Sequence, residues 1–220
     1  MGAIRSYPSM TALMKAERAG VDYEIEVIER DSPVAVLALH GGAIEPGTDT
    51  LARAVAGEEF SFYAFRSLAP EKGRLHHVTS HRFDEPRCLA LARRSRVALS
   101  IHGHDGATPW VFPGGRNPAL RRMVMDALIR SRVPVRFSPR LMGLHPRNVV
   151  NLPETAGVQI EVTWGLRSES VSPLSVPRWQ EGRLTDRGRA FAAALHEVLR
   201  AVGRRLETAE KAGRLEGARP

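Results

Sequence analysis

Two apolar stretches of the sequence end in residues that could bind a metal ion. Val34–Leu39 is followed directly by His40 and two glycines, with Glu45 close behind, and Val97–Ile101 is followed by His102. Glycines let the backbone turn sharply and approach a ligand closely. An imidazole and a carboxylate are two of the three protein ligands of a hydrolytic zinc, which keeps a fourth position open for water. Because core packing does not require two apolar strands to end in His-Gly, we predict a zinc site here.

These observations do not identify the third metal ligand, because His104 is an alternative to His102. Side chains two residues apart in a strand point to the same face, so either histidine could reach the metal. A metal-bound histidine normally donates its second ring N–H to a carboxylate or a carbonyl. Asp49 and Asp105 are the candidate carboxylates, and the sequence does not choose between them.

The stretch His40–Thr48, which reads His-Gly-Gly-Ala-Ile-Glu-Pro-Gly-Thr, resembles the signature of the poly-γ-glutamate hydrolase family. That family is known from phages and bacteria and is related in fold to the zinc carboxypeptidases. The chain departs from its pattern at Ala43, where the family has a third glycine. His40 and Glu45 are also five residues apart, whereas the first His and Glu of zinc carboxypeptidases are three apart. Other blocks similar to the family, in the same order, are Tyr7–Gly47, Thr79–Pro86, Ser100–Gly103 and Gly157–Glu161.

The resemblance implies a zinc-dependent hydrolase that cleaves the amide bonds of γ-linked polyglutamate. Its third-ligand block selects His102, so that His40, Glu45 and His102 would hold one Zn²⁺ per chain, while His104 would contact the substrate. Glu161 would be the general base, because its strand resembles the base-bearing strand of the zinc carboxypeptidases. A carboxylate in this role takes the proton from the attacking water, whose pKa the metal lowers to roughly 7.

Residue chemistry alone leaves the role of Glu161 open. An unpaired glutamate is costly inside an apolar strand, and this favours a functional role. Alternation with Gln159 and Thr163 equally permits a solvated face of the strand. Glu154 and Glu85 are therefore kept as alternative bases.

A polyglutamate substrate carries one carboxylate per residue, so its cleft needs cationic groups. Arginine suits this task because its guanidinium binds planar carboxylates through two hydrogen bonds. For each arginine taken alone, a solvated surface charge is the competing interpretation. His81 is the strongest candidate, because it lies within a block similar to the family. The predicted substrate-binding residues are His81, Arg82, His104, Arg116 and Arg147.

The overall charge is strongly basic, with 32 Lys and Arg against 24 Asp and Glu, a net charge of +8 and a pI of about 10.6. A basic protein attracts polyanions, so the expected partner is an acidic polymer or peptide. Arginine usage in a GC-rich genome would explain the same excess without any function. Two alternative functions stay open: an amidase acting on small peptides or other γ-glutamyl compounds, and a nucleic-acid-binding protein without catalysis, which we disfavour. The oligomeric state is not indicated.

Targeting and covalent-catalysis motifs are absent from the sequence. No apolar run approaches the roughly 18 residues of a membrane span, and no secretory signal is visible at the N-terminus, so we expect a cytoplasmic protein without a membrane partner. Cys88 is the single cysteine, which excludes an internal disulfide and fits a core thiol. No Gly-x-Ser-x-Gly elbow or phosphate-binding loop occurs.

Strands alternating with helices must position these residues, which predicts an α/β protein. With the family resemblance, we expect a single domain over residues 1–220 with a mixed central sheet flanked by helices, as in zinc carboxypeptidases, and a frayed tail from about residue 207. The Pro/Gly/Asn-rich connection Ser138–Pro153 is long enough to carry function. Expected helices are Thr11–Ala19, Thr48–Ala56, Asp84–Arg94, Asn117–Arg130 and one from about Thr185. Expected strands are Tyr23–Ile28, Val34–Leu39, Phe60–Phe65, His76–Thr79, Val97–Ile101, Val133–Phe137 and Gly157–Trp164.

Overall fold

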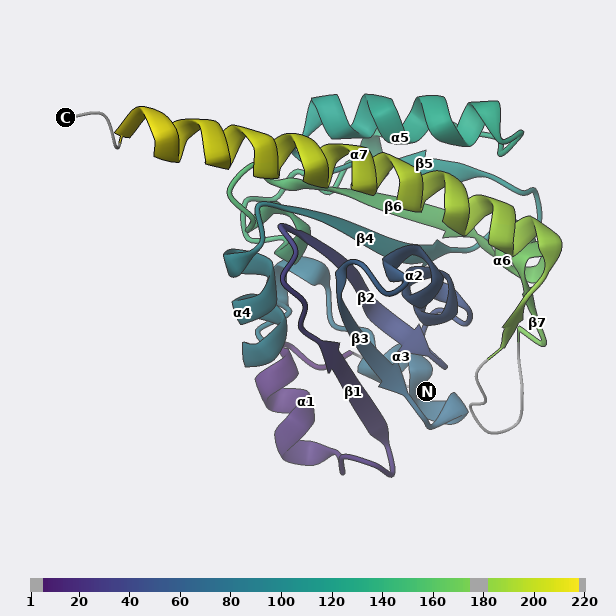
Figure 1. The fold of residues 1–220 in the computed structure, drawn as a ribbon. Helices are drawn as coiled ribbons and strands as arrows, with labels where there is room; N and C mark the ends of the chain where they lie inside the picture. Colours follow the sequence, from purple (N-terminus) through teal and green to yellow (C-terminus); the bar gives the residue numbers. More distant parts are fainter. Residues whose placement is uncertain (1–5, 175–181, 218–220) are drawn as a thin grey trace.

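A six-stranded sheet forms the centre of the computed structural model, which describes residues 6–174 and 182–217 (Figure 1). Its strands are β1 (Tyr23–Ile28), β2 (Val34–Gly42), β3 (Ser61–Ser67), β4 (Val97–His104), β5 (Val111–Pro113) and β6 (Gly157–Thr163). They lie in the order β1-β3-β2-β4-β6-β5. The strands β3, β2, β4 and β6 are parallel, and β1 and β5 are antiparallel edge strands. The carboxyl ends of β2, β4 and β6 therefore meet at one edge, where open α/β sheets bind their ligands.

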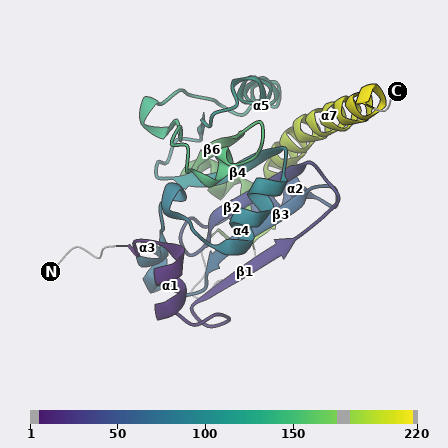
Figure 2. The same cartoon turned by 90° about the vertical axis from the view of Figure 1, so that its left-hand side faces the viewer.

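Helices cover both faces of the sheet. Figure 1 shows α5 and α7 on one face and α1 and α4 on the other, and both views show the end of α7 projecting beyond the sheet (Figure 2). The helices are α1 (Met10–Ala16), α2 (Thr48–Ala56), α3 (Gly73–His76), α4 (Pro86–Arg94), α5 (Pro118–Arg130), α6 (Trp164–Ser170) and α7 (Asp186–Gly217). Short 3₁₀ helices are Pro70–Lys72, Ser80–Arg82, Pro139–Leu141 and Val149–Asn151, and a small hairpin pairs β7 (Val171–Ser172) with β8 (Arg183–Leu184).

Two hydrophobic clusters result, one on each face of the sheet. The α2/α5/α7 cluster contains Leu51, Val124 and Phe191, together with Val36 and Leu99 from the strands. The α1/α4 cluster contains Leu13 and Leu91, together with Leu37 of β2 and Ala98 of β4. Every residue of β2 is buried, as its unbroken apolar run predicts for a strand covered on both faces. No helix within residues 6–174 or 182–217 has the length and apolar character that a membrane span requires.

The predicted α/β class with a mixed sheet is confirmed, and several element boundaries agree with the sequence. The predicted strand Tyr23–Ile28 and helix Thr48–Ala56 have the observed bounds. Asn117 caps α5 at the start of the predicted helix, with its side chain accepting a hydrogen bond from the Leu120 amide. Helix α4 also follows the prediction, but its cap is Glu85, because Asp84 accepts two hydrogen bonds from Thr11 instead.

Two expectations about strands are wrong. The stretch 76–79 is not a strand, because His76 ends α3 and the chain then turns toward the sheet edge. The stretch 133–137 forms only an isolated bridge between Val135 and Val111. Within the tail expected to fray from about residue 207, α7 continues to Gly217, and residues 218–220 lie outside the described part of the chain. Short apolar runs resemble strands in sequence, so only tertiary pairing distinguishes them.

Candidate metal centre

A β-bulge in β2 brings His40 to the correct face of the sheet. In a regular strand His40 would share a face with Val36 and Ala38, which pack in the α2/α5/α7 cluster. The pairing of β2 with β3 instead shifts register between Ala38 and Gly41. The imidazole of His40 consequently lies beside Phe83, on the α1/α4 side, with ring centroids 6.5 Å apart. Bulges often redirect a side chain at an active site in this way.

The two glycines after His40 are both required by close backbone approach. Gly42 has φ +64, and a Cβ there would lie 2.3 Å from the Ser67 carbonyl oxygen. A Cβ at Gly41 would lie 2.8 Å from the Cβ of Asp49. The turn that follows is closed by Thr48, whose hydroxyl donates to the Glu45 carbonyl. This turn returns the Glu45 side chain toward the end of β4.

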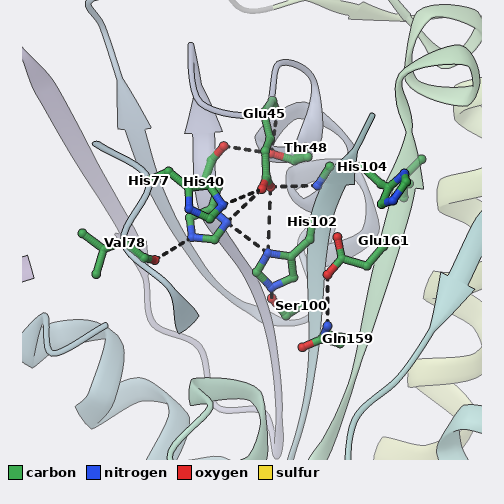
Figure 3. Close-up of polar contacts among 12 residues, drawn as sticks. His40, Glu45, Thr48, His77, Val78, Ser100, His102, His104, Gln159 and Glu161 are labelled. Atoms are coloured by element: carbon green, nitrogen blue, oxygen red, sulfur yellow. Dashed lines mark hydrogen bonds and ion pairs between the residues drawn. The ribbon is translucent and has the colours of Figure 1, made fainter. Parts of the chain in front are cut away.

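Four potential metal donors converge at this edge of the sheet (Figure 3). His40 Nδ1 lies 3.0 Å from Glu45 Oε1 and 3.2 Å from His102 Nδ1. His102 Nδ1 lies 3.8 Å from Glu45 Oε2, and that oxygen also accepts the Gly103 amide at 2.7 Å. The fourth donor is His77 Nε2, 3.3 Å from Glu45 Oε1. The sequence prediction named three of these groups and missed His77.

The hydrogen bonds of the histidines direct lone pairs toward one point. His40 Nε2 lies 2.8 Å from the Val78 carbonyl oxygen, which can only accept, so Nε2 carries the proton. His102 Nε2 lies 2.8 Å from Ser100 Oγ, which can accept in the same way. With both rings in this neutral tautomer, the two Nδ1 lone pairs face each other and the Glu45 carboxylate. A cation between them, either a proton on His40 or a metal ion, stabilises this arrangement.

The spacing of these donor atoms fits a zinc ion. Bonds of about 2.0–2.2 Å in a tetrahedral arrangement separate the ligand atoms by roughly 3.3 Å. Among His40, Glu45 and His102 the separations are 3.0, 3.2 and 3.8 Å, and His77 lies 3.3 Å from Glu45, so all four values lie near it. Imidazole nitrogen and carboxylate oxygen are also the donor types that zinc takes in hydrolytic sites. The residues present therefore fit the ion.

Without a metal ion, His40 and Glu45 form a buried ion pair. Burial alone would lower the pKa of His40, but the adjacent Glu45 carboxylate outweighs burial and raises that pKa. Burial would raise the pKa of Glu45, yet the charge of His40 and the hydrogen bonds from His40 and His77 hold it well below its usual range. Burial and the His40 charge together lower the pKa of His102 to about 3. His102 thus stays neutral, which is the form that binds metal.

Glu161 lies beside the cluster and is held by a chain of amide groups. It is the register partner of His102 across β4 and β6. Gln159 Nε2 donates to Glu161 Oε1 at 3.0 Å, and Gln159 Oε1 accepts from Asn148 at 2.7 Å. Gly143 allows the loop to approach, because its φ is +58 and a Cβ would lie 2.0 Å from Gln159 Oε1. The long connection predicted to carry function therefore positions the carboxylate.

The environment of Glu161 suits a general base. Burial, followed by the negative charge of Glu45, raises the pKa of Glu161 to about 8. A base works best when its pKa lies near the working pH. The alternative bases have structural roles instead: Glu85 accepts the Cys88 amide at the start of α4, and Glu154 pairs with Arg96.

Arg167 in α6 links the three segments that carry the site, and the sequence analysis did not identify it. Its guanidinium donates to the carbonyl oxygens of Pro46 at 2.7 Å, Val162 at 3.1 Å and His104 at 3.4 Å. These carbonyls adjoin Glu45, Glu161 and the end of β4. A Cβ at Gly103 would lie 2.8 Å from the guanidinium carbon, so only glycine admits this contact. The residue lies beyond the blocks that resemble the family, so no motif signalled it.

The two carboxylates expected to accept hydrogen bonds from the proposed ligand histidines have other surroundings. Asp49 accepts a hydrogen bond from Arg66 at 2.8 Å and contacts neither ligand histidine. Asp105 is exposed at the rim of the cleft. A backbone carbonyl at Val78 and the hydroxyl of Ser100 take the supporting role instead. Both are compatible with metal binding, because the carbonyl fixes the tautomer of His40 and the hydroxyl can accept from His102 Nε2.

The cluster opens into a cleft of about 660 Å³. His81 and His104 line this cleft, as predicted for substrate contacts, together with Arg74, Arg140 and His145, which the sequence analysis did not select. Arg82 and Arg147 line an adjoining pocket that also includes His81. Arg116 lines neither cavity and offers its backbone amide to Asn151. The geometry therefore brings four of the five predicted contacts to the cleft or its neighbour.

The chain is similar in sequence to one protein family and to curated relatives. The sequence profile of the poly-γ-glutamate hydrolase family matches residues 7–194. Two curated relatives come from Bacillus subtilis (strain 168): the UPF0714 protein YndL is 33% identical over 150 residues, and the SPbeta prophage-derived UPF0714 protein YoqZ is 30% identical over 161 residues. The matches cover 66% and 71% of this chain but only 59% and 58% of the relatives.

Solved structures match over nearly the whole chain. A bacteriophage poly-γ-glutamate hydrolase superposes with a TM-score of 0.83 at 29% identity, covering 95% of this chain and 99% of the other. Zinc-free YndL superposes with a TM-score of 0.82 at 28% identity, covering 89% and 98%. An N-formylglutamate amidohydrolase from Ralstonia eutropha JMP134 shares the fold, with a TM-score of 0.55 at 14% identity, covering 86% and 99%.

Proposed function

The chain belongs to the poly-γ-glutamate hydrolase family, and on that premise we propose that it is a zinc-dependent hydrolase of γ-linked polyglutamate. The observation that carries this proposal is the convergence of His40, Glu45 and His102 beside the half-buried side chain of Glu161, whose pKa is raised. The relative YndL has a structure described as zinc-free, which supports zinc as the ion. The proposal is a single catalytic domain that binds one zinc ion per chain.

His40, Glu45 and His102 are the proposed ligands. All three are buried, and hydrogen bonds hold both histidines and the carboxylate in place. His77 is the remaining donor, but its side chain is 44% exposed and it lies in a loop after α3. We therefore assign His77 to the open side of the ion, where it would meet the substrate or water.

Zinc bound here would polarise the scissile carbonyl group and lower the pKa of water to roughly 7. Glu161 takes the proton from the attacking water and passes it to the departing amine. Gln159 holds this carboxylate through a hydrogen bond of 3.0 Å, so that it stays aligned between the two transfers. Cations at the cleft, such as Arg74 and Arg140, bind the free α-carboxylates of the polymer.

The variant Glu161→Gln tests this assignment. It is nearly isosteric, so zinc content should stay near one ion per chain. The initial rate of poly-γ-glutamate cleavage should fall at least about 100-fold, the low end for general-base catalysis. Glu154→Gln is the matched control, because Glu154 pairs with Arg96 away from the cleft, and it should retain the full rate. Near-normal turnover by Glu161→Gln would refute the role of this residue.

A further inference from the structure

A second, arginine-lined pocket adjoins the cleft. It has a volume of about 360 Å³ and shares His81 with the cleft. Three arginines line it: Arg82 from the 3₁₀ helix before α4, Arg93 from the last turn of α4, and Arg147 from the loop that holds Gln159. The stacked rings of His81 and His145, with centroids 4.6 Å apart, lie at the junction with the cleft.

The arginines of this pocket are available to a ligand. All three are exposed, and none forms an ion pair with an acidic side chain of residues 6–174 and 182–217. Asp84 is the acidic residue of the lining, and its carboxylate already accepts two hydrogen bonds from Thr11. The pocket therefore presents an excess of positive charge. The positive charges of Arg82 and Arg147 contribute to the lowered pKa of His81, after burial and His145.

The pocket is also partly apolar. Phe83 is buried beneath it, and Leu89 and Leu152 line it with their side chains half-buried. A γ-linked glutamyl chain has matching chemistry, because each unit carries one free α-carboxylate and two backbone methylene groups. The guanidinium groups suit the carboxylates, and the apolar side chains suit the methylenes. A nucleic acid would instead present phosphates and bases, and this pocket offers no exposed aromatic platform for stacking.

We propose that this pocket is a distal subsite that binds the α-carboxylates of γ-linked glutamyl units remote from the scissile bond. The inference rests on the proposed function of the cleft, because the polymer would cross from one cavity to the other over His81. A long chain would occupy both cavities at once, whereas a short oligomer would fill the cleft alone. The subsite thus makes the protein prefer long polymers and allows cleavage within a chain.

The double variant Arg93→Gln/Arg147→Gln tests the subsite, with Arg122→Gln as the control for lost charge. Arg122 is exposed on α5, which covers the opposite face of the sheet and lines neither cavity. The measurement is kcat/KM of the zinc-loaded protein on long poly-γ-glutamate and on a γ-linked glutamate trimer. The double variant should lower the long-to-short ratio about tenfold, as two exposed ion pairs would, mainly through KM. Arg122→Gln should leave both values unchanged.

The outcomes of this experiment distinguish failure of the subsite from failure of the proposed hydrolytic function. An unchanged ratio in the double variant, or an equal fall in Arg122→Gln, would overturn the subsite. If the wild type cleaves neither substrate, the proposed function fails, and the subsite is then judged by fluorescence anisotropy with labelled poly-γ-glutamate. Binding lost in the double variant alone would support it, and no binding to any form would overturn it. Loss of duplex DNA binding with unaltered polymer binding would assign the pocket to nucleic acid and also overturn it.

Discussion

Each histidine proposed as a ligand uses its two ring nitrogens differently, and this division describes the candidate site at the residue scale. His40 and His102 direct Nδ1 toward Glu45, while Nε2 meets an oxygen on the protein side. The types and spacing of these three residues could be predicted from the sequence. The oxygens that accept hydrogen bonds from these histidines could not be predicted, because a backbone carbonyl such as that of Val78 cannot be recognised from the residue type. His77 was missed since a strand was expected where the chain turns toward the site.

The ligand set is tested by comparing His102→Ala with His77→Ala. Loss of a buried ligand should abolish stoichiometric zinc binding, so dialysed His102→Ala should contain well below one ion per chain. His77→Ala should keep its zinc, because the three buried donors remain, while its rate of polymer cleavage falls. Zinc content by atomic emission spectrometry and the cleavage rate are measured on the same samples. The reverse result, with zinc lost only from His77→Ala, would make His77 the third ligand.

Glu161 should make the metal-free protein less stable as the pH rises. The pKa of Glu161 is about 8 in the folded chain, against an ordinary value of 4.5. Between these values the folded state holds a proton that the unfolded state has released, so the free energy of unfolding decreases with increasing pH. For one group the slope is at most about 1.4 kcal/mol per pH unit.

Glu161→Gln cannot ionise and should lack this contribution. In chelator, its stability relative to wild type should therefore increase steadily from pH 5 to pH 8, and the difference between the two proteins should be constant below about pH 4.5. Urea unfolding followed by circular dichroism at several pH values measures the difference. Parallel stability profiles for the two proteins would contradict the raised pKa.

At the scale of elements, the candidate site lies where regular strands end or are interrupted by a bulge. The apolar runs of β2 and β4 and the cap of α5 were predictable, because periodicity and capping residues are local signals. The bulge between Ala38 and Gly41 was not, although it decides which face His40 occupies. It arises from pairing with β3, which is a long-range contact. The same holds for Arg167, whose three acceptors come from distant segments.

Arg167→Met should weaken both the fold and the metal centre. The Pro46, Val162 and His104 carbonyls would lose a donor, and each unsatisfied buried group costs about 1–3 kcal/mol. Zinc affinity should fall by roughly 10–100-fold, as for other outer-shell partners of metal sites. Arg167→Lys keeps the charge with fewer donors and should be intermediate in both. Reduced stability with unaltered zinc affinity would limit Arg167 to a role in the scaffold.

At the scale of the whole molecule, the larger apolar cluster and the candidate site lie in different parts of the sheet. The α2/α5/α7 face carries the larger apolar cluster, whereas the metal centre and both cavities lie at the carboxyl edge beside the α1/α4 face. The net charge of +8 has a local counterpart in the arginines and histidines around the cleft. Composition predicted an acidic partner, but only the folded chain locates the charges that would meet it.

A zinc titration of chelated protein tests the central claim most directly. Protein freed of metal is mixed with increasing zinc, and cleavage of poly-γ-glutamate is measured at each ratio, with His40→Ala in parallel. We predict no cleavage without zinc, a linear rise that levels off at about one ion per chain, and no rise for His40→Ala. Full cleavage by the metal-free protein, or equal rates for wild type and His40→Ala, would contradict a zinc-dependent hydrolase.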